Sequence, residues 1–371
     1  YKNFYKGGVY LFSIGFCGAA AALVFLRPFL RSYYDLEVHL PMKRIIPLCL
    51  ALVMTVGLLA GCGKQNEPAA SDETRLRVVT TIFPEYDWVR EILGDKADNA
   101  EVTMLLDNGV DLHSYQPTAD DIDKIADCDL FIYVGGESDD WVKDALKNST
   151  NKDMKVINLL DVLKDSIKTE ETKPGMQAEE EHEDDENDEH EEKEYDEHVW
   201  LSLKNAKPLV EKISEDLQEL DPENKEIYAS NTKAYVKKLS DLDAKYRETA
   251  DTAKRKTVLF GDRFPFRYLT DDYGLNYYAA FAGCSAETEA SFKTVSFLAK
   301  KVDELKLPCV LTIEGNKHKI AETIVKNTAE KNQKVLTMDS MQSTTSKDVD
   351  NGATYLSIME KNLSVLKKAL N

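Results

Sequence analysis

The sequence predicts an α/β protein with two lobes, each built on a mostly parallel sheet, and one long rigid helix that joins them. Short runs rich in β-branched residues alternate with stretches of helical spacing, in one series from residue 75 and in a second from residue 254. Between the two series, apolar residues recur at helical spacings over about 30 residues, which corresponds to roughly 45 Å of helix. Because that length exceeds the diameter of one lobe, we expect the helix to cross between the lobes.

The first series predicts an N-terminal lobe over residues 75–221. Gly94 ends its first helix, and Thr118 with Asp121 forms a capping box that starts the second. Strands are expected at residues 76–81, 102–106, 130–134 and 156–159, and helices at residues 88–93, 119–126, 141–146 and 208–220. Strands that alternate with helices in this way favour a parallel sheet.

The joining helix is expected over residues 222–253. Asp221 is a suitable N-cap, and Pro222 suits the first helical position. The apolar stripe of this helix consists of Tyr228, Tyr235, Leu239, Leu242 and Tyr246. The second series then predicts a C-terminal lobe over residues 254–371, with strands at 257–260, 275–281, 309–313 and 335–338 and helices at 291–305, 317–330 and 352–370.

The amino-acid composition excludes some classes of function. The chain has 371 residues and a formal net charge of −19, and 43% of its residues are hydrophobic. The hydrophobic fraction suffices for real cores and excludes global disorder. The negative charge argues against nucleic-acid binding, which needs clustered Lys and Arg. Most of the charge is local, because residues 179–198 carry fourteen acids and one Lys, and we expect residues 170–197 to form a mobile acidic loop.

Residues 42–61 have the order of a secretory signal peptide. Lys43 and Arg44 provide a positive start, and an apolar run follows. The sequence Leu59-Ala60-Gly61-Cys62 resembles a bacterial lipobox, in which the Cys is lipidated and becomes the mature N-terminus. Residues 62–74 then form a polar tether. Residues 7–26 are apolar and long enough to span a bilayer, so residues 1–41 are either a membrane segment or translated sequence ahead of the real start.

Two histidines stand in patterns that indicate ligand binding. His113 lies in a loop directly after a predicted strand, at the edge where α/β sheets place their ligands. His198 follows the acidic run, and the apolar residues 199–201 are expected to hold it against the lobe. His182 and His190 lie within the acidic run, which is either a solubilising tract or a loop for weak, exchangeable zinc capture.

Four features together resemble the zinc and manganese solute-binding proteins of ABC importers. They are the segment 78–84, the Gly-Val-Asp-x-His-x-Tyr-x-Pro loop around His113, the Asp-x-His-x-Trp-Leu-Ser motif around His198, and the acidic insert that contains histidines. The resemblance extends over residues 75–371, and the insert is typical of the zinc branch. It implies two α/β lobes hinged weakly by a rigid helix, with the metal held in the cleft between them.

The resemblance also implies a ligand set. His113 and His198 match the two imidazole ligands of the first lobe. The third family ligand is a His or Glu after the first strand of the second lobe, where this chain has no His. Asp262 is the nearest candidate, whereas an ungapped match places Arg263, which cannot ligate, at that position. The reserve candidates are Glu287 and Glu289.

Asp339 matches the fourth family ligand, which is usually an Asp after a late strand. Glu314 ends another strand on the same expected edge and is a candidate outer group, and Asp111 is a candidate orienting group for His113. Imidazole and carboxylate donors suit Zn²⁺, and the same set accepts Mn²⁺ with added oxygens. Cys284 and Cys309 either pair or remain free thiols.

The implied function is that of a lipid-anchored zinc receptor on the extracytoplasmic face of a bacterial cell membrane. It would act as a monomer, without catalysis, and hand its metal to an ABC permease that a separate cytoplasmic ATPase drives. A manganese- or iron-selective receptor and a metal-independent surface adhesin of the same fold are the alternatives. A zinc hydrolase would need an open metal position and a general base, and the sequence has no His-Glu-x-x-His helix to supply them.

Overall fold

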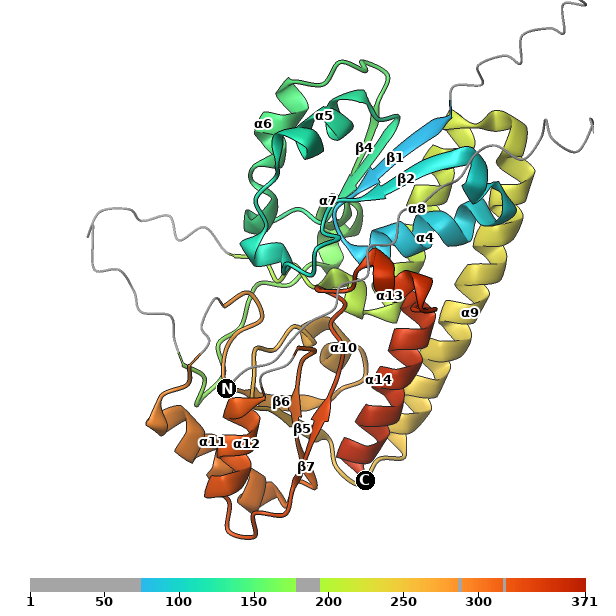
Figure 1. Cartoon of the computed structure of the whole chain (residues 1–371). Helices are drawn as coiled ribbons and strands as arrows, with labels where there is room; N and C mark the ends of the chain where they lie inside the picture. The colour runs from blue at the N-terminus through green and yellow to red at the C-terminus, as the bar shows by residue number, and fades with distance from the viewer. Residues whose placement is uncertain (1–74, 178–193, 286–288, 316–317) are drawn as a thin grey trace, which may run out of the picture. The chain divides into compact units, whose positions relative to one another are not determined.

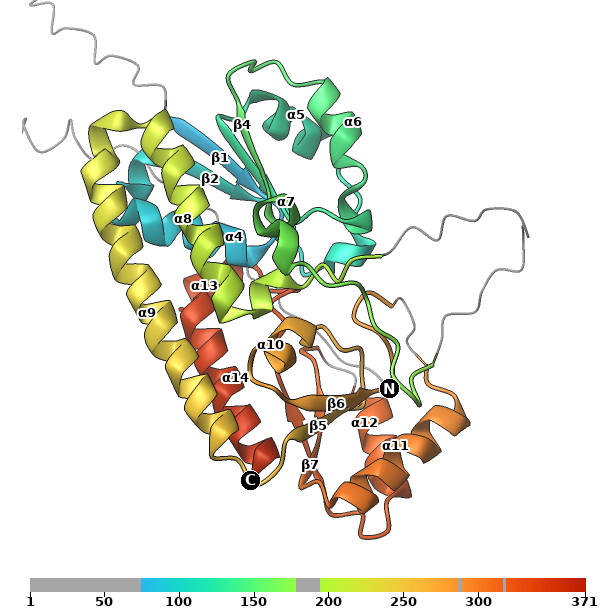
Figure 2. The ribbon, with the colours of Figure 1, turned by 180° about the vertical axis from the view of Figure 1, so that it is seen from behind.

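Each lobe is built around a parallel sheet of four strands, as the alternation of strand and helix patterns predicts (Figures 1 and 2). The computed structural model describes residues 75–177, 194–285, 289–315 and 318–371. The strand order is β2-β1-β3-β4 in the N-terminal lobe and β6-β5-β7-β8 in the C-terminal lobe. The strands are β1 (Leu76–Thr80), β2 (Ala100–Met104), β3 (Leu130–Tyr133), β4 (Lys155–Asn158), β5 (Thr257–Phe260), β6 (Asn276–Ala279), β7 (Cys309–Thr312) and β8 (Lys334–Thr337).

The two sheets share one strand order, so β2 and β6 hold equivalent places in the two lobes. In such sheets the loops after the strands meet at one edge and form the ligand site. The helices of the N-terminal lobe are α4 (Phe83–Leu93), α5 (Ala119–Asp127), α6 (Val142–Lys147), α7 (Leu159–Leu163) and α8 (Leu203–Leu220). Those of the C-terminal lobe are α10 (Arg267–Asp272), α11 (Phe292–Leu305), α12 (Lys319–Asn327), α13 (Ser346–Asp350) and α14 (Tyr355–Leu370).

Several predictions lie outside the described residues. These are the signal peptide with Cys62 and its flanking segments, and the candidate ligands His182, His190 and Glu287. Among the described residues, no helix is long and apolar enough to cross a membrane.

The long joining helix is confirmed. Asp221 accepts a hydrogen bond from the backbone N–H of Asn224 and caps a 3-10 turn over Pro222–Asn224, after which α9 (Lys225–Asp251) continues for 27 residues. All five residues of its predicted apolar stripe are buried. The preceding helix α8 begins at Leu203 rather than at residue 208, because the Ser202 hydroxyl caps it and Pro208 is accommodated inside the helix.

The C-terminal helix α14 also connects the two lobes. It lies beside α9 (Figure 1). Its first residue, Tyr355, contacts the N-terminal lobe. The Tyr355 ring packs edge-on against Trp88 of α4 at 5.2 Å between centroids, and its hydroxyl donates a hydrogen bond to the Trp200 carbonyl at 2.6 Å. One continuous hydrophobic cluster therefore includes residues of both sheets. The sequence prediction that one helix joins the lobes was incomplete, because it missed this second connection.

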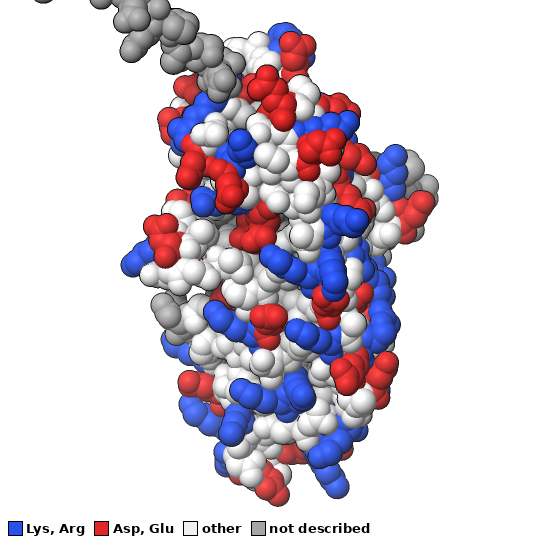
Figure 3. Space-filling model, turned by 90° about the vertical axis from the view of Figure 1, so that its right-hand side faces the viewer, with Lys and Arg blue, Asp and Glu red and all other residues white. Residues whose placement is uncertain are grey.

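Acidic and basic side chains are mixed on the face of the molecule that includes α9 (Figure 3). Lys237 pairs with Asp241 at 2.6 Å within the helix, and Lys245 lies 3.8 Å from Glu360 of α14. Such exposed pairs contribute at most about 1 kcal/mol each. Acidic and basic side chains are thus interspersed on this face.

Asp87, a buried carboxyl of α4, accepts a hydrogen bond from the backbone N–H of Tyr355 at 3.0 Å. Burial raises the pKa of Asp87 to about 7. A carboxyl with a raised pKa binds its proton more tightly in the folded state, so its contribution favours folding at low pH and is lost as the pH rises through about 7. As the pH rises from about 4 to about 7, we therefore expect the free energy of unfolding to fall less in Asp87→Asn than in the parent protein.

The difference between Asp87→Asn and parent should change by about 1 kcal/mol per pH unit in this range, measured by urea unfolding at several pH values. The comparison cancels the other buried carboxyls, which both proteins share. Parallel curves for variant and parent would contradict the raised pKa.

Candidate metal centre

The two predicted imidazole ligands occupy loops that carboxylates hold in place. His113 lies in a 3-10 turn, η2 (Leu112–Ser114), in the connection after β2, and its backbone N–H donates to Asp111 Oδ1 at 3.1 Å. His198 immediately precedes the turn η5 (Val199–Leu201), and its backbone N–H donates to Asp196 Oδ1 at 3.0 Å. Both motifs read Asp-x-His, so in each the Asp side chain bonds the backbone two residues on and sets the direction of the His.

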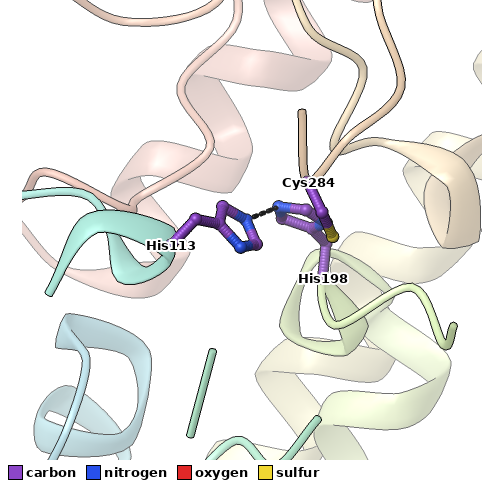
Figure 4. Close-up of side chains that lie close together, drawn as sticks. All are labelled: His113, His198 and Cys284. Atoms are coloured by element: carbon purple, nitrogen blue, oxygen red, sulfur yellow. Dashed lines mark hydrogen bonds between the residues drawn. The ribbon is translucent and has the colours of Figure 1, made fainter. Parts of the chain in front are cut away.

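The two imidazole rings point their Nε2 atoms toward each other, with 3.2 Å between them (Figure 4). His113 Nδ1 lies 2.7 Å from Ser138 Oγ and 3.5 Å from Glu197 Oε2. His198 Nδ1 lies 3.0 Å from Asp196 Oδ1. Because these partners engage both Nδ1 atoms, both Nε2 atoms can direct a lone pair at one shared point. This is the arrangement that metal-ligating imidazoles use.

The two rings differ in their affinity for protons. Burial, and then the neighbouring charge of His198, lower the pKa of His113 to about 3. Burial alone would also lower the pKa of His198. The nearby Asp196 and Glu197 carboxylates have a larger, opposite effect, so the pKa of His198 is raised. His113 is therefore neutral and ready to ligate, whereas a proton on His198 competes with a metal.

Asp196 is in turn fixed by the C-terminal lobe. Its carbonyl accepts a hydrogen bond from the Tyr268 hydroxyl of α10 at 2.8 Å, and the same hydroxyl accepts from the Lys168 backbone N–H at 2.9 Å. Thr169 and Tyr195 form an antiparallel bridge beside them. The described ends of the predicted acidic loop thus lie together against α10, next to the group that orients His198.

Cys284 is the third member of the cluster. Its sulfur and one nitrogen of each imidazole all lie within 4.8 Å of one another. Among the described residues, these three side chains form the one cluster of three or more His, Cys, Asp or Glu residues close enough to hold a metal ion. Cys284 lies in the loop after β6, and its thiol is free, as is that of Cys309. The two cysteines left open as a possible pair are therefore not joined. Burial and nearby carboxylates raise the pKa of the Cys284 thiol, so it is protonated before any metal binds.

The structure does not bring Asp262 to the histidines. Its Oδ2 accepts hydrogen bonds from the Thr312 hydroxyl and the Ile313 backbone N–H, and its Oδ1 accepts from the Arg263 backbone N–H. Both carboxylate oxygens are thus engaged within the C-terminal lobe. Arg263 instead reaches the other lobe, where its guanidinium contacts Asp111 Oδ2 at 2.6 Å.

The other predicted carboxylates also lie outside the cluster. Asp339 Oδ1 accepts from the Met341 backbone N–H at 2.8 Å, and Glu314 accepts three hydrogen bonds from Ser340 and Gln342. Burial, and then the charge of Asp339, raise the pKa of Glu314 to about 7. Asp339 and Glu314 line a separate cavity of about 360 Å³.

Glu289, a reserve candidate, and His318 also have other surroundings. Glu289 is exposed, and its carbonyl accepts a hydrogen bond from Gln177. His318 occupies the N-cap position of α12, and its Nδ1 lies 3.2 Å from the Thr312 hydroxyl.

Sequence reasoning did not place Cys284 in this cluster and considered it only as a disulfide partner of Cys309 or as a free thiol. The available signal was its place after β6, because the loops that follow parallel strands meet at the ligand-binding edge. Asp111 acts on His113 through the backbone N–H of that residue rather than through its imidazole nitrogen, and it also pairs with Arg263.

Comparison with known proteins places these features in a family. The family model described as "Zinc-uptake complex component A periplasmic" matches residues 78–369. The zinc-binding lipoprotein AdcA of Streptococcus pneumoniae strain R6 is 33% identical over 328 residues, which cover 88% of this chain and 61% of that protein. The high-affinity zinc uptake system protein ZnuA of Bacillus subtilis is 33% identical over 319 residues, which cover 84% of this chain and 94% of that protein.

Among solved structures, the Zn(II)-bound ZnuA-like domain of Streptococcus pneumoniae AdcA matches with a TM-score of 0.61 and 31% identity, over 80% of this chain and 99% of that domain. The two-lobed fold, the paired histidines and the extent of the match agree with one another. The chain belongs to the family of zinc-uptake complex component A, the ZnuA family.

Proposed function

We propose that this protein is an extracytoplasmic receptor that captures Zn²⁺ and delivers it to an ABC permease. The observation that carries the proposal is the pair of imidazole Nε2 atoms, 3.2 Å apart with their Nδ1 atoms held by other groups. Two nitrogen ligands at the roughly 2.0–2.1 Å typical of zinc would stand about 3.3 Å apart in a tetrahedral site. Little rearrangement is needed to admit the ion.

The position of the cluster suits a receptor. His113 and His198 belong to the N-terminal lobe, and Cys284 belongs to the C-terminal lobe. An ion that contacts groups of both lobes favours the arrangement in which the lobes approach, so occupancy changes the shape that a permease meets. Related proteins support the zinc assignment, since the AdcA lipoprotein and the Bacillus subtilis ZnuA are both named for zinc.

The cellular setting follows from the same proposal. Cys62, in its lipobox-like sequence, would carry the lipid that anchors the receptor at the outer face of the cell membrane. The protein would act as a monomer beside a permease with a cytoplasmic ATPase, and it would release the ion without chemical change.

Zinc titration of the metal-stripped protein, followed by isothermal calorimetry, tests this function. We expect one ion per chain with a Kd tighter than about 1 µM, which corresponds to a binding free energy beyond about −8 kcal/mol. Manganese should compete poorly, because divalent ions bind nitrogen and sulfur donors more weakly at the manganese end of the series. The absence of zinc binding in this range would reject the proposal, and tighter binding of manganese would assign the receptor to another metal.

A further inference from the structure

We propose that Cys284 supplies a thiolate ligand from the C-terminal lobe, so that the ion is held by two imidazoles and one sulfur and the site favours thiophilic ions over manganese. This inference rests on the proposed function and specifies the class of cargo. The sulfur lies with the two imidazoles inside one group whose donor atoms are within 4.8 Å of each other (Figure 4). A zinc ion with a sulfur ligand at about 2.3 Å and nitrogen ligands at about 2.0–2.1 Å fits among these atoms after a small closure.

The sequence around Cys284 allows the close approach. Gly283 packs against the His198 ring, and a Cβ on Gly283 would lie 3.0 Å from His198 Cε1 and from the Phe264 carbonyl oxygen. A larger residue would push the loop away from the imidazole. The glycine therefore lets the next residue bring its side chain beside His198.

Two side chains then hold the loop in this position. The Cys284 backbone N–H donates to Glu170 Oε1 at 2.8 Å. The Arg263 guanidinium donates to the Ser285 carbonyl at 3.5 Å and to Asp111 Oδ2 at 2.6 Å. Arg263 thus connects the loop of Cys284 to the loop of His113, which lies in the other lobe.

These contacts bring Cys284 to the place where a third ligand is needed, although the chain has no third imidazole there. A guanidinium has only donors and cannot ligate a cation, so Arg263 acts here as a positioning residue. The equivalent place of β2 and β6 in the two sheets supports the same assignment, because His113 and Cys284 follow these two strands. Each lobe contributes a ligand-type side chain from the same kind of loop.

The cargo preference follows from the donor set. Thiolate and imidazole suit zinc, whereas manganese prefers carboxylate, carbonyl and water oxygens. Binding would convert the Cys284 thiol to a metal-bound thiolate and release its proton to solvent, which leaves the charges balanced. Asp262 cannot substitute without giving up the hydrogen bonds that hold it.

Cobalt substitution tests the sulfur ligand directly, since Co²⁺ bound to a thiolate shows a charge-transfer absorption in the near ultraviolet that Zn²⁺ does not. We expect this band in the parent protein and its loss in Cys284→Ser, with zinc affinity weakened at least about tenfold. Cys309→Ala is the matched control, because Cys309 is a buried thiol at the start of β7 in the same lobe and is not a member of the cluster.

Two further variants keep the test decisive. Cys284→His should restore zinc affinity without the charge-transfer band, and Cys284→Asp should reduce the preference for zinc over manganese by at least about tenfold. A parent protein that binds zinc and cobalt tightly but lacks the band would overturn the role of Cys284 and leave the zinc receptor intact. A parent protein that does not bind zinc would overturn the proposed function and this inference together.

Discussion

His113→Ala is expected to weaken zinc binding at least about 100-fold, a loss of roughly 3 kcal/mol or more in binding free energy. The substitution removes one of two nitrogen donors that face each other at 3.2 Å, and no described side chain within the cluster can replace it. Loss of an outer partner alone typically costs about 10- to 100-fold in metal affinity, so loss of a direct ligand should cost at least as much. Isothermal titration of the metal-stripped variant measures the effect.

His318→Ala provides the matched control for His113→Ala. His318 occupies the N-cap position of α12 and is not a member of the cluster. Its removal should therefore leave zinc affinity within about twofold of the parent, a change of under 0.5 kcal/mol. Circular dichroism should show both variants folded, because His113 lies in a short 3-10 turn and is not part of a sheet or of the hydrophobic core. Equal affinity of His113→Ala and the parent would remove the imidazole pair from the site.

Trp88→Ala is expected to destabilise the protein by about 3–5 kcal/mol. Trp88 is fully buried in α4, and its ring meets Tyr355 of α14 edge-on. Truncation would leave a cavity at a point where helices of both lobes pack together, and the remaining contacts can close it only in part. Urea unfolding, followed by circular dichroism, gives the change in free energy.

Two variants bracket the Trp88 result. Trp88→Phe keeps a ring against Tyr355 and removes an indole N–H that has no hydrogen-bond partner among the described residues. It should therefore cost clearly less stability than the alanine variant. Phe292→Ala should change stability by less than about 0.5 kcal/mol, because this side chain is 81% exposed. A loss for Trp88→Ala as small as that of Phe292→Ala would show that the two lobes do not depend on this contact.

Local patterns in the sequence predicted most of the elements. The strand at Thr257–Phe260 has the predicted bounds, and the helix expected at residues 291–305 begins one residue later, after its Ser291 cap. These elements follow from short-range preferences, namely β-branched runs, apolar periodicity and capping side chains. Bounds shifted where neighbours intervened, as in α8, which starts at Leu203 instead of residue 208.

The sequence did not predict contacts between elements that lie far apart in the chain. The stripe from Tyr228 to Tyr246 indicated a long buried helix, but it could not show that α14 lies beside that helix and binds the N-terminal lobe through Tyr355. Apolar periodicity marks the face of a helix that is buried and says nothing about which element covers it.

The candidate ligands divide along the same line. His113 and His198 could be recognised because each stands in a short local motif. In each motif the structure shows the Asp carboxylate bonding the backbone N–H of the histidine two residues on. The partner from the second lobe depends instead on how two loops meet across the molecule. Hydrogen bonds within the C-terminal lobe hold Asp262, whereas Gly283 and Arg263 bring the loop of Cys284 to His198.

The amino-acid pattern alone thus indicated the α/β class, the long helix and two imidazoles of a metal site, since each is encoded by residues close together in the chain. Only the tertiary structure identified Cys284 as the neighbour of those imidazoles, and Arg263 as the residue whose ion pair with Asp111 connects the two lobes. The physical reason is that a metal site needs donor atoms a few ångströms apart, and that proximity arises from the packing of one lobe against the other.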